Sequence, residues 1–171
     1  MLRPSVRPRR APRSIYTGEA LVVGEFLSVC VAIWRGEVSR APFERQRAGL
    51  AEVVERHPRG AGFLCVIEPT AMPPSDELRR ASIDMVASHG ERLKCVACTI
   101  EGAGFKAAVA RSVLSGMALL FANRKTPVSF FANVSEAVVW MSDRLPLEPL
   151  ADAMVSIGEL RALLAPFRKP P

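Results

Sequence analysis

The chain has 171 residues, 49% of them hydrophobic, which suffices for one domain with a buried core that needs no disulfide or metal cross-links. Its formal net charge is +6, and five positive charges fall within the first 13 residues, so residues 14–171 are nearly neutral. No apolar run could span a bilayer about 30 Å thick and no signal-like apolar segment follows the basic start, so we expect a cytoplasmic protein.

The first 14 residues are rich in Arg and Pro and have few apolar side chains. Such a segment cannot offset its ordering entropy by burial, which predicts a disordered arm over residues 1–14. The arm is either a solvated tail or a segment that attracts the phosphates of a nucleic acid or an anionic membrane. It holds no aromatic side chain that could stack on bases, which favours the tail. The charges concerned are Arg3, Arg7, Arg9, Arg10 and Arg13.

Residues 20–23 and 26–34 have the apolar composition of two strands, and Gly24-Glu25 between them predicts a hairpin turn, which makes the two strands antiparallel. Pro42 then opens an amphipathic helix that ends at residues 57–60. Strand-like runs follow at residues 63–67, 93–100 and 127–131, each leading toward another helical stretch. A last amphipathic stretch covers residues 150–164.

The element order is therefore β-β-α-β-α-β-α-β-α plus an extra C-terminal helix. Alternating strands and helices predict an α/β fold, a two-layer or sandwich arrangement with a mixed, mostly parallel five-stranded sheet. The four cysteines lie within predicted strands, which favours reduced, buried thiols. Cys95 and Cys98 have redox spacing, but residues three apart in a strand point to opposite faces and cannot easily pair.

Three strands end in an acidic residue, at Glu37, Glu68 and Glu101, and we expect all three near one edge of the sheet. Carboxylates there could hold Mg²⁺ or act as an acid and a base. The alternative is that they face helix N-termini. No histidine or strained nucleophile accompanies them in the sequence, so we expect no metal, no cofactor and no catalytic residue. His57 and His89 each stand at a helix end, as capping residues do.

The element order, the final helix from Val134-Ser135-Glu136-Ala137 to Trp140, and the link that leads to Ser75 resemble the STAS domain group, the fold of anti-sigma-factor antagonists of the SpoIIAA type. The resembling domain covers residues 15–143, followed by a C-terminal helix and tail at 144–171. The resemblance implies a non-enzymatic regulatory or adaptor domain that binds a protein partner. It also implies phosphorylation of a serine at the start of the second helix, the position that Ser75 matches best.

The predicted partner-binding or phospho-regulatory residues lie in two strand-to-helix links and are Glu68, Thr70, Ser75, Gly102, Gly104 and Lys106. Ser75 alternatively serves as a plain N-cap, with Asp76 and Glu77 in the first turn opposing an added phosphate. A second function class is a small-ligand or lipid-binding module with the C-terminal helix as its lid. The apolar stripe of that helix also suggests a homodimer. An enzyme that uses the acidic edge is a third, weaker alternative.

Overall fold

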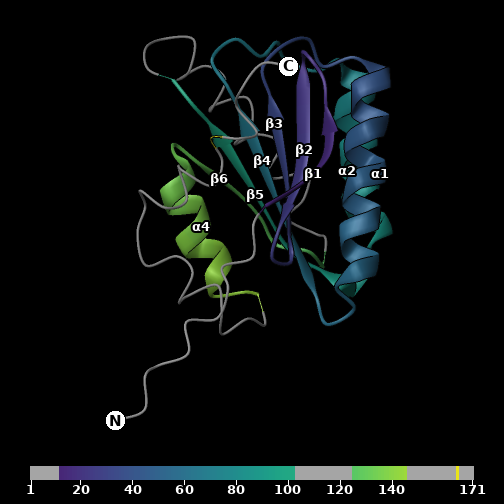
Figure 1. Cartoon of the computed structure of the whole chain (residues 1–171), viewed down its shortest axis with the longest axis vertical. Coiled ribbons are helices and arrows are strands. Elements are labelled where there is room, and N and C mark those ends of the chain that lie inside the picture. The colour runs from purple at the N-terminus through teal and green to yellow at the C-terminus, as the bar shows by residue number, and fades with distance from the viewer. Residues whose placement is uncertain (1–11, 103–124, 146–164, 166–171) are drawn as a thin grey trace.

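The computed structural model describes residues 12–102, 125–145 and 165. Within these ranges the chain forms a mixed α/β fold (Figure 1). The elements, in order, are β1 (Arg13–Thr17), β2 (Leu21–Phe26), β3 (Val29–Trp34), α1 (Arg40–Arg56), β4 (Ala61–Ile67), α2 (Asp76–Ser88), the short 3₁₀ helix η1 (Gly90–Arg92), β5 (Leu93–Ile100), β6 (Val128–Phe131) and α4 (Val134–Ser142).

Six strands form one sheet in the order β1 to β6. β2 is antiparallel to both β1 and β3, whereas β3, β4, β5 and β6 are parallel to one another. The predicted mixed, mostly parallel sheet is thus confirmed, as is the antiparallel start, but the sheet has six strands rather than five. α1 and α2 lie on one side of the sheet and α4 on the other (Figure 1), so the described elements form three layers.

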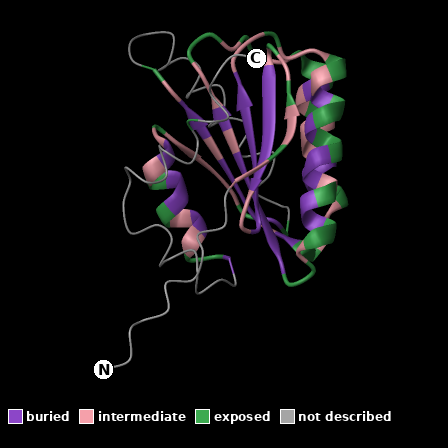
Figure 2. Cartoon of the chain, in the orientation of Figure 1, coloured by how far each residue is buried: buried purple, intermediate pink, exposed green. Residues whose placement is uncertain are grey.

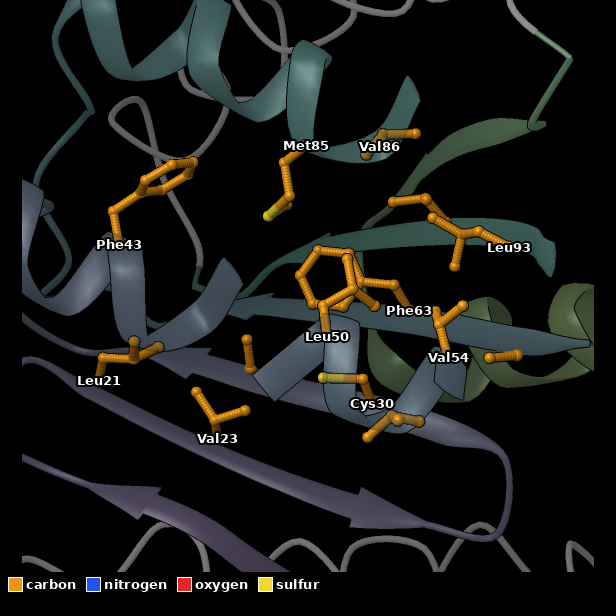
Figure 3. Packing of buried hydrophobic residues seen from close by; sticks show 14 of the residues in the cluster. Leu21, Val23, Cys30, Phe43, Leu50, Val54, Phe63, Met85, Val86 and Leu93 are labelled. Atoms are coloured by element: carbon orange, nitrogen blue, oxygen red, sulfur yellow. The ribbon is translucent and has the colours of Figure 1, made fainter. Parts of the chain in front are cut away.

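Hydrophobic side chains fill both spaces between the layers. The first cluster packs β2, β3 and β4 residues such as Val23 and Phe63 against Leu50 of α1 and Met85 of α2 (Figure 3). The second packs the opposite faces of the same strands against α4. Because β2, β3 and β4 are covered on both faces, they are buried along most of their length (Figure 2). This explains why their sequences are continuously apolar rather than alternating.

A buried polar contact joins the layers inside the first cluster. The indole Nε1 of Trp34 donates to Oε1 of Gln46 over 2.6 Å, and Nε2 of Gln46 lies 3.8 Å from Sδ of Met85. A buried amide without such partners would destabilise the fold. The contact therefore fixes β3, α1 and α2 relative to one another.

The predicted hairpin turn at Gly24-Glu25 is wrong. Both residues belong to β2, and the turn lies at Leu27 and Ser28. This later turn allows an unbroken register from Leu21 opposite Trp34 to Phe26 opposite Val29. Leu27 adopts φ 53°, a conformation that a bulky side chain rarely takes, while its side chain packs against the second cluster.

The predicted boundary of the disordered arm at residue 14 is also wrong, because Arg13 begins β1. This edge strand pairs with β2 from Arg13 opposite Glu25 to Thr17 opposite Val22. The guanidinium of Arg13 contacts Glu25 and Glu52. Arg13 therefore differs from the arginines that were expected to attract an anion. Residues 1–11, with the other four arginines of the arm, lie outside the described residues.

The helix starts agree closely with the sequence. α1 begins at Arg40, two residues before Pro42, with Ser39 at its N-cap position. Asn133 caps α4 through its side chain, which accepts from the amide of Glu136. The helical stretch expected after the strand at residues 93–100 and the one over residues 150–164 lie outside the described residues, and so does the proposed lid. Among the described helices, none is long and apolar enough to cross a membrane.

Candidate functional site at the carboxyl rim

The carboxyl ends of β3, β4 and β5 meet at one edge of the sheet. We use the name carboxyl rim for the residues that follow these strands, namely residues 35–39, 68–75 and 101–102. The parallel register places Trp34 opposite Ile67 and Ile67 opposite Ile100. Ligands usually bind at such an edge in open α/β sheets, which makes the rim the first place to look for a functional site.

Glu68 and Glu101 occupy neighbouring positions on this rim. The amide of Glu68 donates to the Trp34 carbonyl over 2.9 Å, and the amide of Glu101 donates to the Ile67 carbonyl over 2.8 Å. Arg35, the residue that follows β3, lies in the same row as these two glutamates. The neighbouring glutamates were predicted from the sequence, but Arg35 was not. The row therefore holds charges of both signs.

Glu37, the third predicted acid, lies on the same rim two residues beyond the row and is exposed, whereas Glu68 and Glu101 are partly buried. In the described part of the chain, no three His, Cys, Asp or Glu side chains are grouped so that they could hold a metal ion. The three glutamates therefore share an edge without forming one cluster.

The link between β4 and α2 is exposed but has a fixed backbone. The amide of Ala71 donates to the Glu68 carbonyl over 3.0 Å, and the amide of Met72 donates to the Gly36 carbonyl over 3.1 Å. The second bond ties this link to the one between β3 and α1. The side chain of Met72 is nonetheless 60% exposed, and Thr70 is exposed beside it.

Gly36 also lets the link between β3 and α1 lie close to Ala20, in the turn between β1 and β2. A Cβ atom at position 36 would lie 3.1 Å from both Cα and Cβ of Ala20. The backbone of Ala20 is itself held, because its carbonyl accepts from the amide of Arg35 over 2.9 Å. A side chain at position 36 would therefore push against backbone that cannot easily move.

Ser75 closes the link as the N-cap of α2. Its Oγ accepts a hydrogen bond from the amide of Leu78 over 3.3 Å, and its side chain is otherwise exposed. Asp76 and Glu77 occupy the first turn, where they complement the positive end of the helix dipole. The predicted capping role of Ser75 is confirmed, and its phosphorylation remains a prediction.

The second predicted link is described only at its start. Gly102 is exposed and has φ 115°, a conformation that suits glycine. Gly104 and Lys106 lie outside the described residues. Three of the predicted residues, Glu68, Thr70 and Ser75, thus lie together on one link, and Gly102 lies on the same rim.

A charged cluster that the sequence analysis missed lies at the opposite end of the sheet. The carboxylate of Glu25 is buried and contacts the side chains of Arg13, Arg56 and His57. Nε of Arg13 lies 2.6 Å from Oε2, while Nε2 of His57 and Nε of Arg56 lie 2.7 and 3.3 Å from Oε1. We call this set, with Glu52 beside Arg13, the Glu25 cluster. It joins β1, β2 and the end of α1.

The pKa of Glu25 reflects two opposing effects. Burial would raise the pKa of this carboxyl, but the hydrogen bonds from His57 and Arg13 and the charges of Arg13 and Arg56 outweigh burial and lower it. The amide of His57 also bonds the Val53 carbonyl, so the predicted helix-end role of His57 is confirmed. Its side chain has the further role of holding Glu25, which the spacing of the two residues in the sequence did not reveal.

Comparison of the chain with protein-family models, with curated proteins and with solved structures gives no match. The functional argument therefore rests on the geometry of the carboxyl rim and of the Glu25 cluster.

Proposed function

We propose that the carboxyl rim binds a protein partner and that the chain works as a non-enzymatic adaptor or regulatory domain. The observation that carries this proposal is the link at residues 68–75, whose backbone is held by hydrogen bonds while most of its side chains, Thr70 and Met72 among them, are exposed. A surface that is already ordered loses little conformational entropy on binding. The proposal is also what the resemblance to STAS domains implies.

The composition of the rim supports a protein partner over a simple ion. Met72 offers an exposed, flexible apolar side chain, a type common at adaptable protein-binding surfaces. Charges of both signs lie at the helix starts that follow the rim, as in the exposed pair of Arg40 and Glu77 at 3.4 Å. A partner that fits this surface has an apolar contact at its centre and polar groups of both signs around it.

The Glu25 cluster does not compete with the rim as a site. Its carboxylate is already contacted by Arg13, Arg56 and His57, so the charges of the cluster serve one another. The thiol of Cys30, which lies opposite Glu25 in the sheet, is fully buried. A buried thiol with a pKa raised by burial makes a poor nucleophile. These contacts support a structural role for the cluster.

Photo-crosslinking in the source cells tests the proposal. A benzophenone amino acid would replace Thr70 on the rim or, as a control, the exposed Arg59 at the opposite end of the sheet. We expect a defined crosslinked protein from position 70 and none of that mass from position 59. The same species from both positions, or none from position 70, would contradict binding at the rim.

A matched pair of substitutions sharpens this test. Met72 and Val139 are exposed to nearly the same degree, 60% and 61%, but Val139 lies on α4. Met72→Glu should abolish the crosslink from position 70, whereas Val139→Glu should leave it unchanged. Intact-mass analysis of the protein from the same cells would show whether Ser75 is phosphorylated. If only the unmodified mass is found, Ser75 acts as a cap alone.

A further inference from the structure

The four cysteines differ in their surroundings. Cys30 and Cys95 are fully buried, whereas Cys65 and Cys98 are partly exposed. Cys95 belongs to the second cluster and Cys98 packs against the first, so the two residues with redox spacing lie on opposite faces, as predicted. They cannot form a disulfide with each other.

Cys98 instead has a partner on the next strand. The register of β4 and β5 places it directly opposite Cys65, and both side chains pack against the same cluster. Adjacent strands lie about 4.8 Å apart, which falls within the usual range of Cα separations in disulfides. The neighbouring Cys98 also affects the pKa of Cys65, which shows that the two thiols interact. Two partly exposed thiols therefore meet on one face of the sheet.

The two sulfur atoms are not equivalent. The hydrogen bond with Cys98, together with burial, raises the pKa of Cys65 well above its usual value. Cys65 therefore keeps its proton. We assign the first attack to Cys98 and the second to Cys65, an order that the variants below test.

We propose that Cys65 and Cys98 form a redox-active dithiol that a small disulfide of the glutathione type converts to an intramolecular disulfide. The Cys98 thiolate attacks one sulfur of the small disulfide, which breaks the S–S bond and releases one small thiol. The sulfur of Cys65 then loses its proton to solvent, attacks the sulfur of Cys98 in the mixed disulfide, and releases the second small thiol. The protein loses two protons and two electrons, which reduce the small disulfide to two thiols.

The sheet should make this disulfide easy to reduce again. Neighbouring strands lie about 4.7–4.9 Å apart, whereas a disulfide holds the two Cβ atoms at about 3.5–4.5 Å. The bond therefore draws β4 and β5 together against their hydrogen-bonded spacing. Strained disulfides are the labile and regulatory ones, so the reaction is expected to be reversible.

The test uses the full-length protein, reduced and then incubated in glutathione buffers of increasing oxidised fraction. After acid quenching, alkylation and denaturation, intact mass gives the number of free thiols and peptide mapping gives the linkage. We expect the count to fall from four to two, with Cys65 linked to Cys98, and to return to four on reduction. Circular dichroism during the incubation verifies that the protein stays folded.

Three variants locate the chemistry. Cys95→Ala, which removes the other thiol of the redox spacing, should still form the linkage. Cys65→Ser should stop at a glutathione adduct on Cys98, and Cys98→Ser should form neither adduct nor linkage at position 65. A wild-type count that stays at four, or a linkage that involves Cys30 or Cys95, would overturn the proposal without any variant. An adduct at position 65 in Cys98→Ser would overturn the order of attack.

Discussion

At one end of the sheet Glu25 is buried among Arg13, Arg56 and His57, whereas at the other end Thr70 and Met72 are exposed on a link whose backbone is fixed. Both regions hold charged residues, and both depend on contacts between segments far apart in the sequence. They differ in whether side chains or backbone groups make these contacts. Side chains contact one another in the Glu25 cluster, while at the carboxyl rim backbone hydrogen bonds hold the link at residues 68–75 and side chains such as Thr70 and Met72 are exposed.

This difference separates residues that hold the fold from residues that remain available for binding. It also ranks the expected effects of substitution on stability. Loss of the Glu25 carboxylate at the centre of its cluster should destabilise the protein most, changes in the backbone contacts of the rim less, and changes in the exposed side chains of the rim least. Four substitutions, taken in that order, test whether the ranking holds.

Glu25→Gln should have the largest effect. The substitution removes the charge that Arg13, Arg56 and His57 share, and we expect a loss of about 2–3 kcal/mol in the free energy of unfolding, measured with urea. Glu52→Gln is the control, because Glu52 is 45% exposed and should contribute less than about 1 kcal/mol. Equal losses from both variants would contradict the special role of Glu25.

The pH dependence of stability checks the same residue. The pKa of Glu25 is lowered from 4.5 in the folded state, so the unfolded state binds the proton more tightly. The stabilising contribution is complete above that unfolded value and is lost as the pH falls through the lowered folded pKa. The difference between wild type and Glu25→Gln should therefore shrink from about pH 5 to about pH 3. A difference that stays constant over this range would argue against an ionised Glu25 as the cause.

Gly36→Ala should have an intermediate effect. The added Cβ would meet Cα and Cβ of Ala20 at 3.1 Å, and such overpacking should cost about 1–2 kcal/mol. The bond from the Met72 amide to the Gly36 carbonyl should loosen as well, which faster hydrogen exchange at Met72 would reveal. Adding Ala20→Gly should restore part of the loss, because it removes one of the two contacts. If Ala20→Gly restores none of the lost stability, contact with Ala20 is not what destabilises Gly36→Ala.

Ser75→Ala should cost about 1 kcal/mol, the usual value of an N-cap, measured by thermal or urea unfolding. Ser88→Ala is a suitable comparison near the other end of α2, where the hydroxyl only donates to the Met85 carbonyl. We expect a smaller loss there. If the two losses are equal, the cap of α2 is not the special contact that we describe.

Met72→Glu should have the smallest effect on stability, within about 0.5 kcal/mol, because its side chain is exposed. Its effect on partner binding should be the largest of the four. A marked loss of stability would show that Met72 is part of the packing, and the crosslinking result with this variant could then no longer be attributed to the rim surface.

Much of the fold could be predicted from local patterns. The apolar runs at β3, β4 and β5 are unmistakable because both faces of these strands are buried. Ser75 and Asn133 mark helix starts by the chemistry of single residues. The neighbouring glutamates of the rim followed from one rule, that parallel strands end at one edge, and the register then placed Glu68 beside Glu101.

The missed features depend on contacts between distant residues. β1 was not predicted because it follows an Arg- and Pro-rich segment. Its first residue, Arg13, is held by Glu25, twelve positions away, and no local pattern in the sequence indicates that contact. The turn at Leu27 was missed because glycine is the usual signal for positive φ and Gly24 stood nearby, while packing holds Leu27 in that conformation instead. Glu25 itself looked like a turn residue, since nothing local announces that His57 is its partner.

The position of β1 has a practical consequence for experiments. Arg13 lies opposite Glu25, and Glu25 lies opposite Cys30 near the start of β3, so the polypeptide enters the sheet at the end away from the rim. An affinity tag or surface attachment placed ahead of Arg13 is therefore joined to the molecule on the side remote from Thr70 and Met72. Protein immobilised in this orientation presents the carboxyl rim outward to a soluble analyte.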